Sequence, residues 1–153
     1  LYPQASGSLE FELTESLLAS NIPDTIASMQ QLKARGFRLA IDDFGTGYSS
    51  LSYLRQMPVD IIKIDKSFVF GMLDNQADFD IITSTIAMVR KLGLEVVAEG
   101  VETQAQREWL TQHQCTVMQG FLVAPGLSVE QARAFPAQLD WQNLPLRNEK
   151  PAG

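Results

Sequence analysis

The sequence predicts an α/β fold built on a parallel β-sheet, and three observations lead to this prediction. Five short apolar runs, each of six or seven residues, are separated by segments with helical periodicity. A parallel return between two strands needs a crossover of about a dozen residues, which a helix supplies. The runs in the middle of the chain are apolar at nearly every position, as expected for strands that are covered on both faces.

The first two strands are expected at "SLEFEL" (8–13) and "FRLAID" (37–42). A helix is expected between them, over about 24–35. Apolar residues recur along one side of this segment, Pro23 stands at its start, and Gly36 follows its end.

The next two strands are expected at "DIIKID" (60–65) and "LEVVAE" (94–99). The helix between them, over about 76–92, has the clearest pattern in the chain. Its apolar residues recur at helical spacing, and Gly93 follows as a stop signal.

The last strand is expected at "CTVMQGF" (115–121), with a helix on each side of it. Thr103 and Ser128 are each followed three residues later by a glutamine. This spacing is typical of a capping box, so a helix is expected to begin after each of them.

The composition is that of one globular domain. The chain has 153 residues, 45% hydrophobic and 20% charged, and a chain of this size buries roughly 70% of its unfolded surface. The net charge of −6 argues against binding to a DNA or RNA polymer. The single cysteine, Cys115, lies in an apolar run and is expected to fill the core. No apolar run approaches the roughly 20 residues of a membrane span, and a cytoplasmic location is expected.

The two ends of the chain lack periodicity. Residues 1–8 are interpreted as a leader or linker and residues 138–153 as a polar tail. The domain is therefore expected over residues 9–137.

Polar residues at the carboxyl ends of the predicted strands are the main functional signal. In parallel α/β folds these ends share one face, where side chains converge on a site. Each residue alone could be a helix cap, a solvated group or part of an Asx turn, but their recurrence at every strand favours a site. They are Glu12, Asp42, Asp43, Lys63, Asp65, Glu99 and Gln119.

Lys63 strengthens this prediction. It lies between Ile62 and Ile64, where a desolvated ammonium is costly unless carboxylates or a phosphate surround it. Strand alternation places Lys63 and Asp65 on the same side. A purely structural buried ion pair is the alternative interpretation.

Asp42 and Asp43 are adjacent, and their repulsion is relieved if divalent cations lie between them and other acids. Both can face the site if the chain turns at the strand end. Carboxylate oxygens suit Mg²⁺ or Mn²⁺, whereas one histidine and one cysteine are too few for a zinc site. Two such cations can activate water and stabilise an in-line phosphoryl displacement. Gly45 and Gly47 allow a sharp loop over the site.

Two stretches have the same arrangement, "ELTES" (12–16) and "EGVET" (99–103). Each has a second glutamate three residues after the first, Glu15 and Glu102. This glutamate either accepts backbone N–H bonds from a neighbouring loop or favours a helix N-terminus, and spacing alone does not separate the two. His113 is expected to be solvated and is assigned no chemistry.

Taken together, these stretches resemble the EAL-domain family, bacterial phosphodiesterases that open cyclic di-GMP to linear pGpG. The motifs occur in the family's order over residues 9–126: "ELTES", "DDFGTGYSSL", "VDIIKIDKSFV", "AEGVET" and "QGF" followed by Pro125. The resemblance implies a TIM-barrel-like (β/α) fold that binds Mg²⁺ or Mn²⁺. Its implied metal ligands are Glu12, Asp42 and Asp43.

The resemblance also implies roles for the remaining residues. Lys63 would hold the nucleophilic water or the phosphate, and Glu99 would be a second-metal ligand or a base. Asp65, Glu102 and Gln119 would contact the substrate or support the ligands. Glu15 would tether the loop from Phe44 to Ser50, which in the family lies near a dimer contact.

The sequence also departs from the family's pattern. The EAL signature with its metal-binding glutamate is absent, as is the strand with the ligating asparagine, and both belong to the family's amino-terminal half. A closed barrel needs eight strands, so the five expected here indicate an incomplete barrel, the carboxy-terminal part of the domain. Its two open edges favour pairing with a second copy. A homodimer is therefore expected.

The predicted function of the parent domain is hydrolysis of cyclic di-GMP by metal-activated water. The chain by itself is expected to be slow or inactive. The alternatives are a receptor that binds cyclic di-GMP without cutting it and an interaction module that dimerises through its edges. An upstream sensory or cyclase domain is expected in the parent protein, where other domains could provide membrane attachment.

Overall fold

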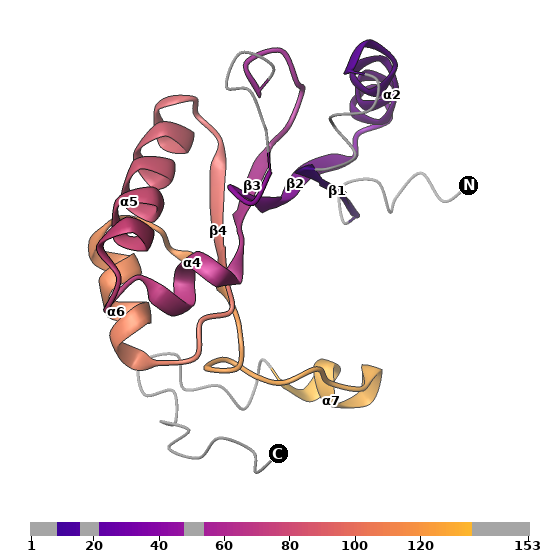
Figure 1. Cartoon of the computed structure of the whole chain (residues 1–153). Coiled ribbons are helices and arrows are strands. Elements are labelled where there is room, and N and C mark those ends of the chain that lie inside the picture. Colours follow the sequence, from indigo (N-terminus) through magenta and orange to yellow (C-terminus); the bar gives the residue numbers. More distant parts are fainter. Residues whose placement is uncertain (1–8, 16–21, 48–53, 136–153) are drawn as a thin grey trace.

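The computed structural model describes residues 9–15, 22–47 and 54–135. Among them, five strands form one parallel sheet in the order of the chain, β1-β2-β3-β4-β5 (Figure 1). The predicted α/β class is confirmed. The leader at 1–8 and the tail at 138–153 lie outside the described residues. The strands are β1 (Glu10–Thr14), β2 (Arg38–Phe44), β3 (Ile61–Ile64), β4 (Glu95–Glu99) and β5 (Val117–Gln119).

The helices lie between and after the strands, as expected for βα units. The two predicted amphipathic helices and both capping boxes are confirmed, with the helices shifted at their ends by at most two residues. In the described part of the chain, no helix has both the length and the apolar character needed to cross a membrane. The helices are α2 (Ile22–Ala34), α4 (Lys66–Gly71), α5 (Gln76–Lys91), α6 (Gln104–Gln112) and α7 (Val129–Ala134).

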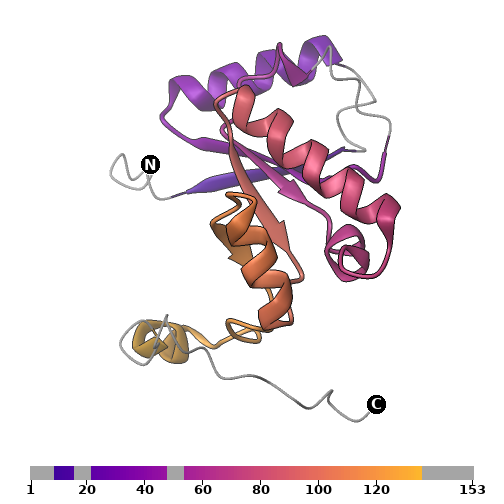
Figure 2. The ribbon, with the colours of Figure 1, turned by 90° about the vertical axis from the view of Figure 1, so that its left-hand side faces the viewer.

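One hydrophobic core joins the sheet to the helices. Alternate residues of β2 and β3, such as Leu39, Ile41 and Ile62, pack in a cluster with Met29 of α2 and Ile86 of α5. In Figure 2 the α5 and α6 helices lie in front of the sheet. The other residues of the central strands therefore face the opposite side of the sheet.

Two elements differ from their predicted extents. β5 ends at Gln119 because the chain turns back at Gly120, where a Cβ would come within 2.2 Å of the carbonyl oxygen of Val101. The short helix α4 was not predicted, since its six residues are too few to show a period. It begins after Asp65, whose carboxylate accepts the N–H of Ser67 at 2.9 Å.

Cys115 is fully buried, as expected, and burial raises the pKa of its thiol to about 11. The expectation for His113 was wrong. Its ring is only partly exposed and stacks on Trp109 with centroids 3.7 Å apart, while Nδ1 lies 2.8 Å from the carbonyl oxygen of the same residue. The apolar face of α6 continues to its last turn and holds the ring there.

Candidate functional site

The candidate site lies on the face of the sheet opposite the helix-covered core. Strand alternation directs Asp42 to this face, because its neighbour Ile41 packs in the core. Lys63 is directed there in the same way, between the core residues Ile62 and Ile64. All the strands are parallel, so their carboxyl ends meet at one rim of the sheet.

Lys63 is the centre of the site. Its ammonium nitrogen lies 2.8 Å from a carboxylate oxygen of Glu12, 3.1 Å from one of Asp42 and 2.7 Å from one of Glu99. The Lys63 side chain is only 7% exposed. Three acids from three strands therefore converge on one buried cation.

Burial alone would lower the pKa of Lys63, because it disfavours the charged ammonium. The contacts with Glu12, Glu99 and Asp42 outweigh burial, and the pKa is raised well above its ordinary value. The three acids therefore stabilise the charged form of Lys63.

A bulge allows the adjacent aspartates to share the site. The register between β2 and β3 shifts between Ile41 and Phe44, and Asp43 has a φ of +54°, in the left-handed region. The chain therefore turns at the strand end, as the sequence prediction required. One carboxylate oxygen each from Asp42, Asp43 and Glu99 lies within 4.8 Å of the others.

Asp43 is flanked by acids. Its pKa is raised, first by burial, then by the charges of Asp42 and Asp65 and by a hydrogen bond with Asp65. Asp65 lies just beyond the end of β3 and caps α4. The carboxylate of Asp65 is therefore joined to the site by its hydrogen bond with Asp43.

Glu15 holds the turn that follows the two aspartates. One of its carboxylate oxygens accepts the N–H groups of Gly45 at 3.1 Å and Gly47 at 3.0 Å. The spacing of Glu15 left two interpretations open, a hydrogen-bond acceptor for a neighbouring loop or a residue that favours a helix N-terminus. The structure shows the contact with the loop. Residues 48–50 of this loop lie outside the described residues.

Glu102 and Gln119 stand apart from the Lys63 contacts. Glu102 is exposed, and its backbone N–H donates to the side-chain oxygen of Gln106 at 2.9 Å. Gln119 is exposed on β5, in register with Glu99. Their suggested roles toward a substrate remain predictions.

The donor set fits a hard divalent cation. It consists of carboxylate oxygens, which Mg²⁺ and Mn²⁺ prefer. The buried Oδ1 of Asp42 lies 3.1 Å from the Lys63 ammonium, yet it accepts no hydrogen bond within the described part of the chain. It therefore retains a lone pair for a metal ion. Asp42, Asp43 and Glu99 are the residues best placed to hold the ion, with Glu12 beside them.

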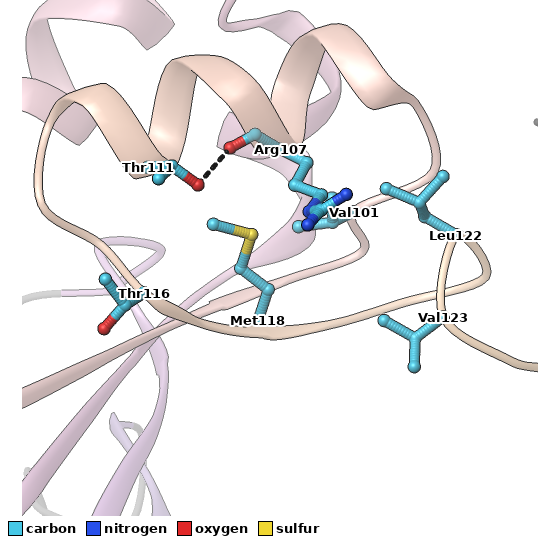
Figure 3. Close-up of a pocket in the computed structure, with 7 residues that line it drawn as sticks. All are labelled: Val101, Arg107, Thr111, Thr116, Met118, Leu122 and Val123. Atoms are coloured by element: carbon cyan, nitrogen blue, oxygen red, sulfur yellow. Dashed lines mark hydrogen bonds between the residues drawn. The ribbon is translucent and has the colours of Figure 1, made fainter. Parts of the chain in front are cut away.

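A pocket of about 250 Å³ lies elsewhere, between α6 and β5 (Figure 3). Met118 points into it, and Thr111 donates a hydrogen bond to the carbonyl oxygen of Arg107 at its edge (2.8 Å). Met118 precedes Gln119 on β5, so the two side chains point to opposite faces of the sheet. This pocket is therefore separate from the acid and lysine site.

The sheet is parallel, helices form its crossovers, and acids and a lysine lie at its carboxyl rim. These features define an α/β protein of the barrel class. Proteins of this class carry their reactive groups at this rim. The model of the EAL domain matches residues 2–126, and the chain belongs to this family. The resemblance noted from the motifs is confirmed.

Relatives of known name support this assignment. The chain is 46% identical over 127 residues to the cyclic di-GMP phosphodiesterase NbdA of Pseudomonas aeruginosa, covering 83% of this chain and 16% of NbdA. It is 42% identical over 129 residues to the bifunctional diguanylate cyclase/cyclic di-GMP phosphodiesterase MucR of the same organism, covering 84% of this chain and 19% of MucR. The chain thus spans less than a fifth of either relative.

Solved structures agree on the fold. The MucR phosphodiesterase in complex with c-di-GMP superposes with a TM-score of 0.80 at 41% identity, covering 83% of this chain and 51% of that one. A manganese and cyclic di-GMP complex of Klebsiella pneumoniae BlrP1 gives a TM-score of 0.73 at 34% identity, covering 82% and 31%. EAL domains are TIM-barrel-like, so the predicted fold class is confirmed.

Proposed function

We propose that this chain supplies the acid and lysine site of a metal-dependent phosphodiesterase that hydrolyses cyclic di-GMP to linear pGpG. The convergence of Glu12, Asp42 and Glu99 on Lys63, with Asp43 alongside, is the observation that carries the proposal. The name of NbdA and the c-di-GMP complex of MucR support the choice of substrate.

In this proposal Mg²⁺ or Mn²⁺ is held by Asp42, Asp43, Glu99 and Glu12. The bound ion supplies Lewis-acid activation of water for attack on a phosphodiester. The manganese in the BlrP1 complex supports this class of ion.

Lys63 acts electrostatically. Its ammonium lies 2.7 to 3.1 Å from three carboxylate oxygens, which stabilise its charged form. Its ammonium is suited to hold a phosphate oxygen or the attacking water and to stabilise negative charge that develops during attack. Glu99, 2.7 Å from that ammonium, either binds the metal or accepts the proton of the water.

The residues around this centre position it. Glu15 fixes the turn at Gly45 and Gly47 through two hydrogen bonds. Asp65 contacts Asp43, and the exposed Gln119 is available to orient the substrate.

We also propose a homodimer and a cytoplasmic site of action, with a sensory or cyclase domain in the same protein. Phe70, in the last turn of α4, and Leu73, just after the helix, are 48% and 46% exposed and offer an apolar surface for pairing. The bifunctional name of MucR supports the presence of a further domain.

Turnover of cyclic di-GMP by variants tests the function. Residues 2–126 would be joined to the part of the MucR phosphodiesterase domain that the match does not cover. Asp42→Asn and Lys63→Ala should each lower kcat by at least about 100-fold. The first removes a carboxylate that would hold the metal ion, and the second removes the cation that would stabilise the reacting phosphate. Asp60→Asn is the matched control, since Asp60 precedes β3 at the opposite rim of the sheet.

Wild-type rates in Asp42→Asn or Lys63→Ala would refute the proposed phosphodiesterase activity of this site. The unjoined chain should be far slower than the joined domain, and equal rates would contradict the need for further ligands. Calorimetry measures the binding of cyclic di-GMP to the joined domain in parallel with the turnover assay. Binding without turnover by the joined domain would favour a receptor instead.

A further inference from the structure

The turn after Asp43 is held from two sides. On the β1 side, Glu15 accepts the N–H groups of Gly45 and Gly47. On the α4 side, the ring of Phe68 lies against Gly45. A Cβ on Gly45 would come within 2.9 Å of Phe68 Cε2 and 3.3 Å of Cζ, so the ring occupies the space next to the backbone.

This turn contains two left-handed residues. Asp43 has a φ of +54° and Gly45 a φ of +101°, with the buried Phe44 between them. A left-handed conformation at a residue other than glycine costs about 1–3 kcal/mol and persists only where the surroundings hold it. The conformation of Asp43 directs its carboxylate toward Asp42 and Glu99. Contacts that hold the turn therefore set the geometry of this acid cluster.

The α4 helix brings the ring to the turn. Asp65 caps the helix and contacts Asp43, which ties the start of α4 to the cluster. Phe68 is the third residue of the helix, and long side chains in a helix lean back toward its N-terminus. The ring is partly buried and packs against the hydrophobic core, so its position is fixed from behind.

We propose that Phe68 is a positioning residue for the acid cluster. Its ring supports the backbone of Gly45 and so keeps Asp43 in the left-handed conformation that places its carboxylate beside Asp42 and Glu99. An apolar ring can act on the turn only through packing. The predicted effect on metal binding rests on the proposed function, whereas support of the turn does not.

The test compares Phe68→Ala and Phe68→Leu with a matched control, Val69→Ala. Val69 is the next residue of α4 and is fully buried in the core. Its truncation therefore destabilises the same helix without removing the contact with Gly45. Circular dichroism checks that each variant of the full chain folds.

Two quantities are measured on each variant. The first is the amide hydrogen exchange of Gly45 and Gly47 in the metal-free chain, relative to the buried amide of Ile62. Phe68→Ala should raise this ratio about tenfold, Phe68→Leu by less, and Val69→Ala not at all. The second is Mn²⁺ affinity by electron paramagnetic resonance, which should fall about tenfold in Phe68→Ala and stay unchanged in Val69→Ala.

An unchanged exchange ratio in Phe68→Ala, or an equal rise in Val69→Ala, overturns the proposal. A raised ratio with unchanged Mn²⁺ affinity also overturns it, because the turn would then not position Asp43. If Phe68→Ala does not fold, Phe68→Leu decides in the same way. If neither the wild-type chain nor the joined domain binds Mn²⁺, the proposed function fails, and the exchange ratios alone decide whether Phe68 holds the turn.

Discussion

At the scale of single residues, the types and spacing of the site residues were readable from the sequence, but their conformations were not. A lysine between two isoleucines implied surrounding acids, and Lys63 contacts three of them. The left-handed φ of Asp43 could not be read from the sequence, because only a minority of aspartates adopt this conformation. Phe68 was also missed, since its contact with Gly45 depends on where α4 lies.

Asp60 gives a pH prediction at this scale. Its two carboxylate oxygens accept hydrogen bonds from the ammonium of Lys33, at 2.6 Å for Oδ1 and 2.8 Å for Oδ2. Oδ2 also accepts the backbone N–H of Leu39 at 2.9 Å. Burial alone would raise the pKa of Asp60, but these hydrogen bonds outweigh it and lower the pKa below its ordinary value. The stabilisation is therefore complete above the unfolded pKa of about 3.9 and is lost as the pH falls through the folded pKa.

Asp60→Asn should lower the free energy of unfolding by about 1–2 kcal/mol at pH 7, because it removes charge-assisted hydrogen bonds. The difference from wild type should shrink as the pH falls below about 4. Urea unfolding at pH 7 and pH 3 measures both values. A difference of the same size at both pH values would show that the charge of Asp60 does not stabilise the fold.

At the scale of elements, periodicity and caps located the strands and the long helices, but α4 was missed. The α4 helix is short and is held by tertiary contacts, among them the bond from Nε2 of Gln106 to the carbonyl oxygen of Val69 (3.0 Å). The oxygen of Gln106 accepts the N–H groups of Glu102 and Thr103, each at 2.9 Å. The sequence predicted this glutamine only as half of a capping box, whereas it also joins α6 to α4.

Gln106→Leu tests that junction. Gln106 is buried, and leucine would leave one carbonyl and two N–H groups without their partner. The free energy of unfolding should fall by about 2–3 kcal/mol. Gln112→Leu, at the exposed last position of α6, is the matched control and should change it by less than about 0.5 kcal/mol. Equal effects in urea unfolding would argue against the junction.

At the scale of the whole molecule, the alternation of strands and helices predicted the parallel sheet and the rim where the site lies. The structure gathers Glu12, Asp42, Asp43 and Glu99 there because parallel strands end on the same side. Separate strands thus contribute carboxylates whose distances from one another no local sequence pattern could predict. That these acids share a divalent metal ion is the central claim.

Anomalous diffraction from crystals of the chain soaked in Mn²⁺ tests this claim most directly. We expect an anomalous peak in contact with the carboxylate oxygens of Asp42, Asp43 and Glu99, and the loss of that peak in Asp42→Asn. Well-ordered carboxylates with no peak among them at saturating Mn²⁺ would contradict it.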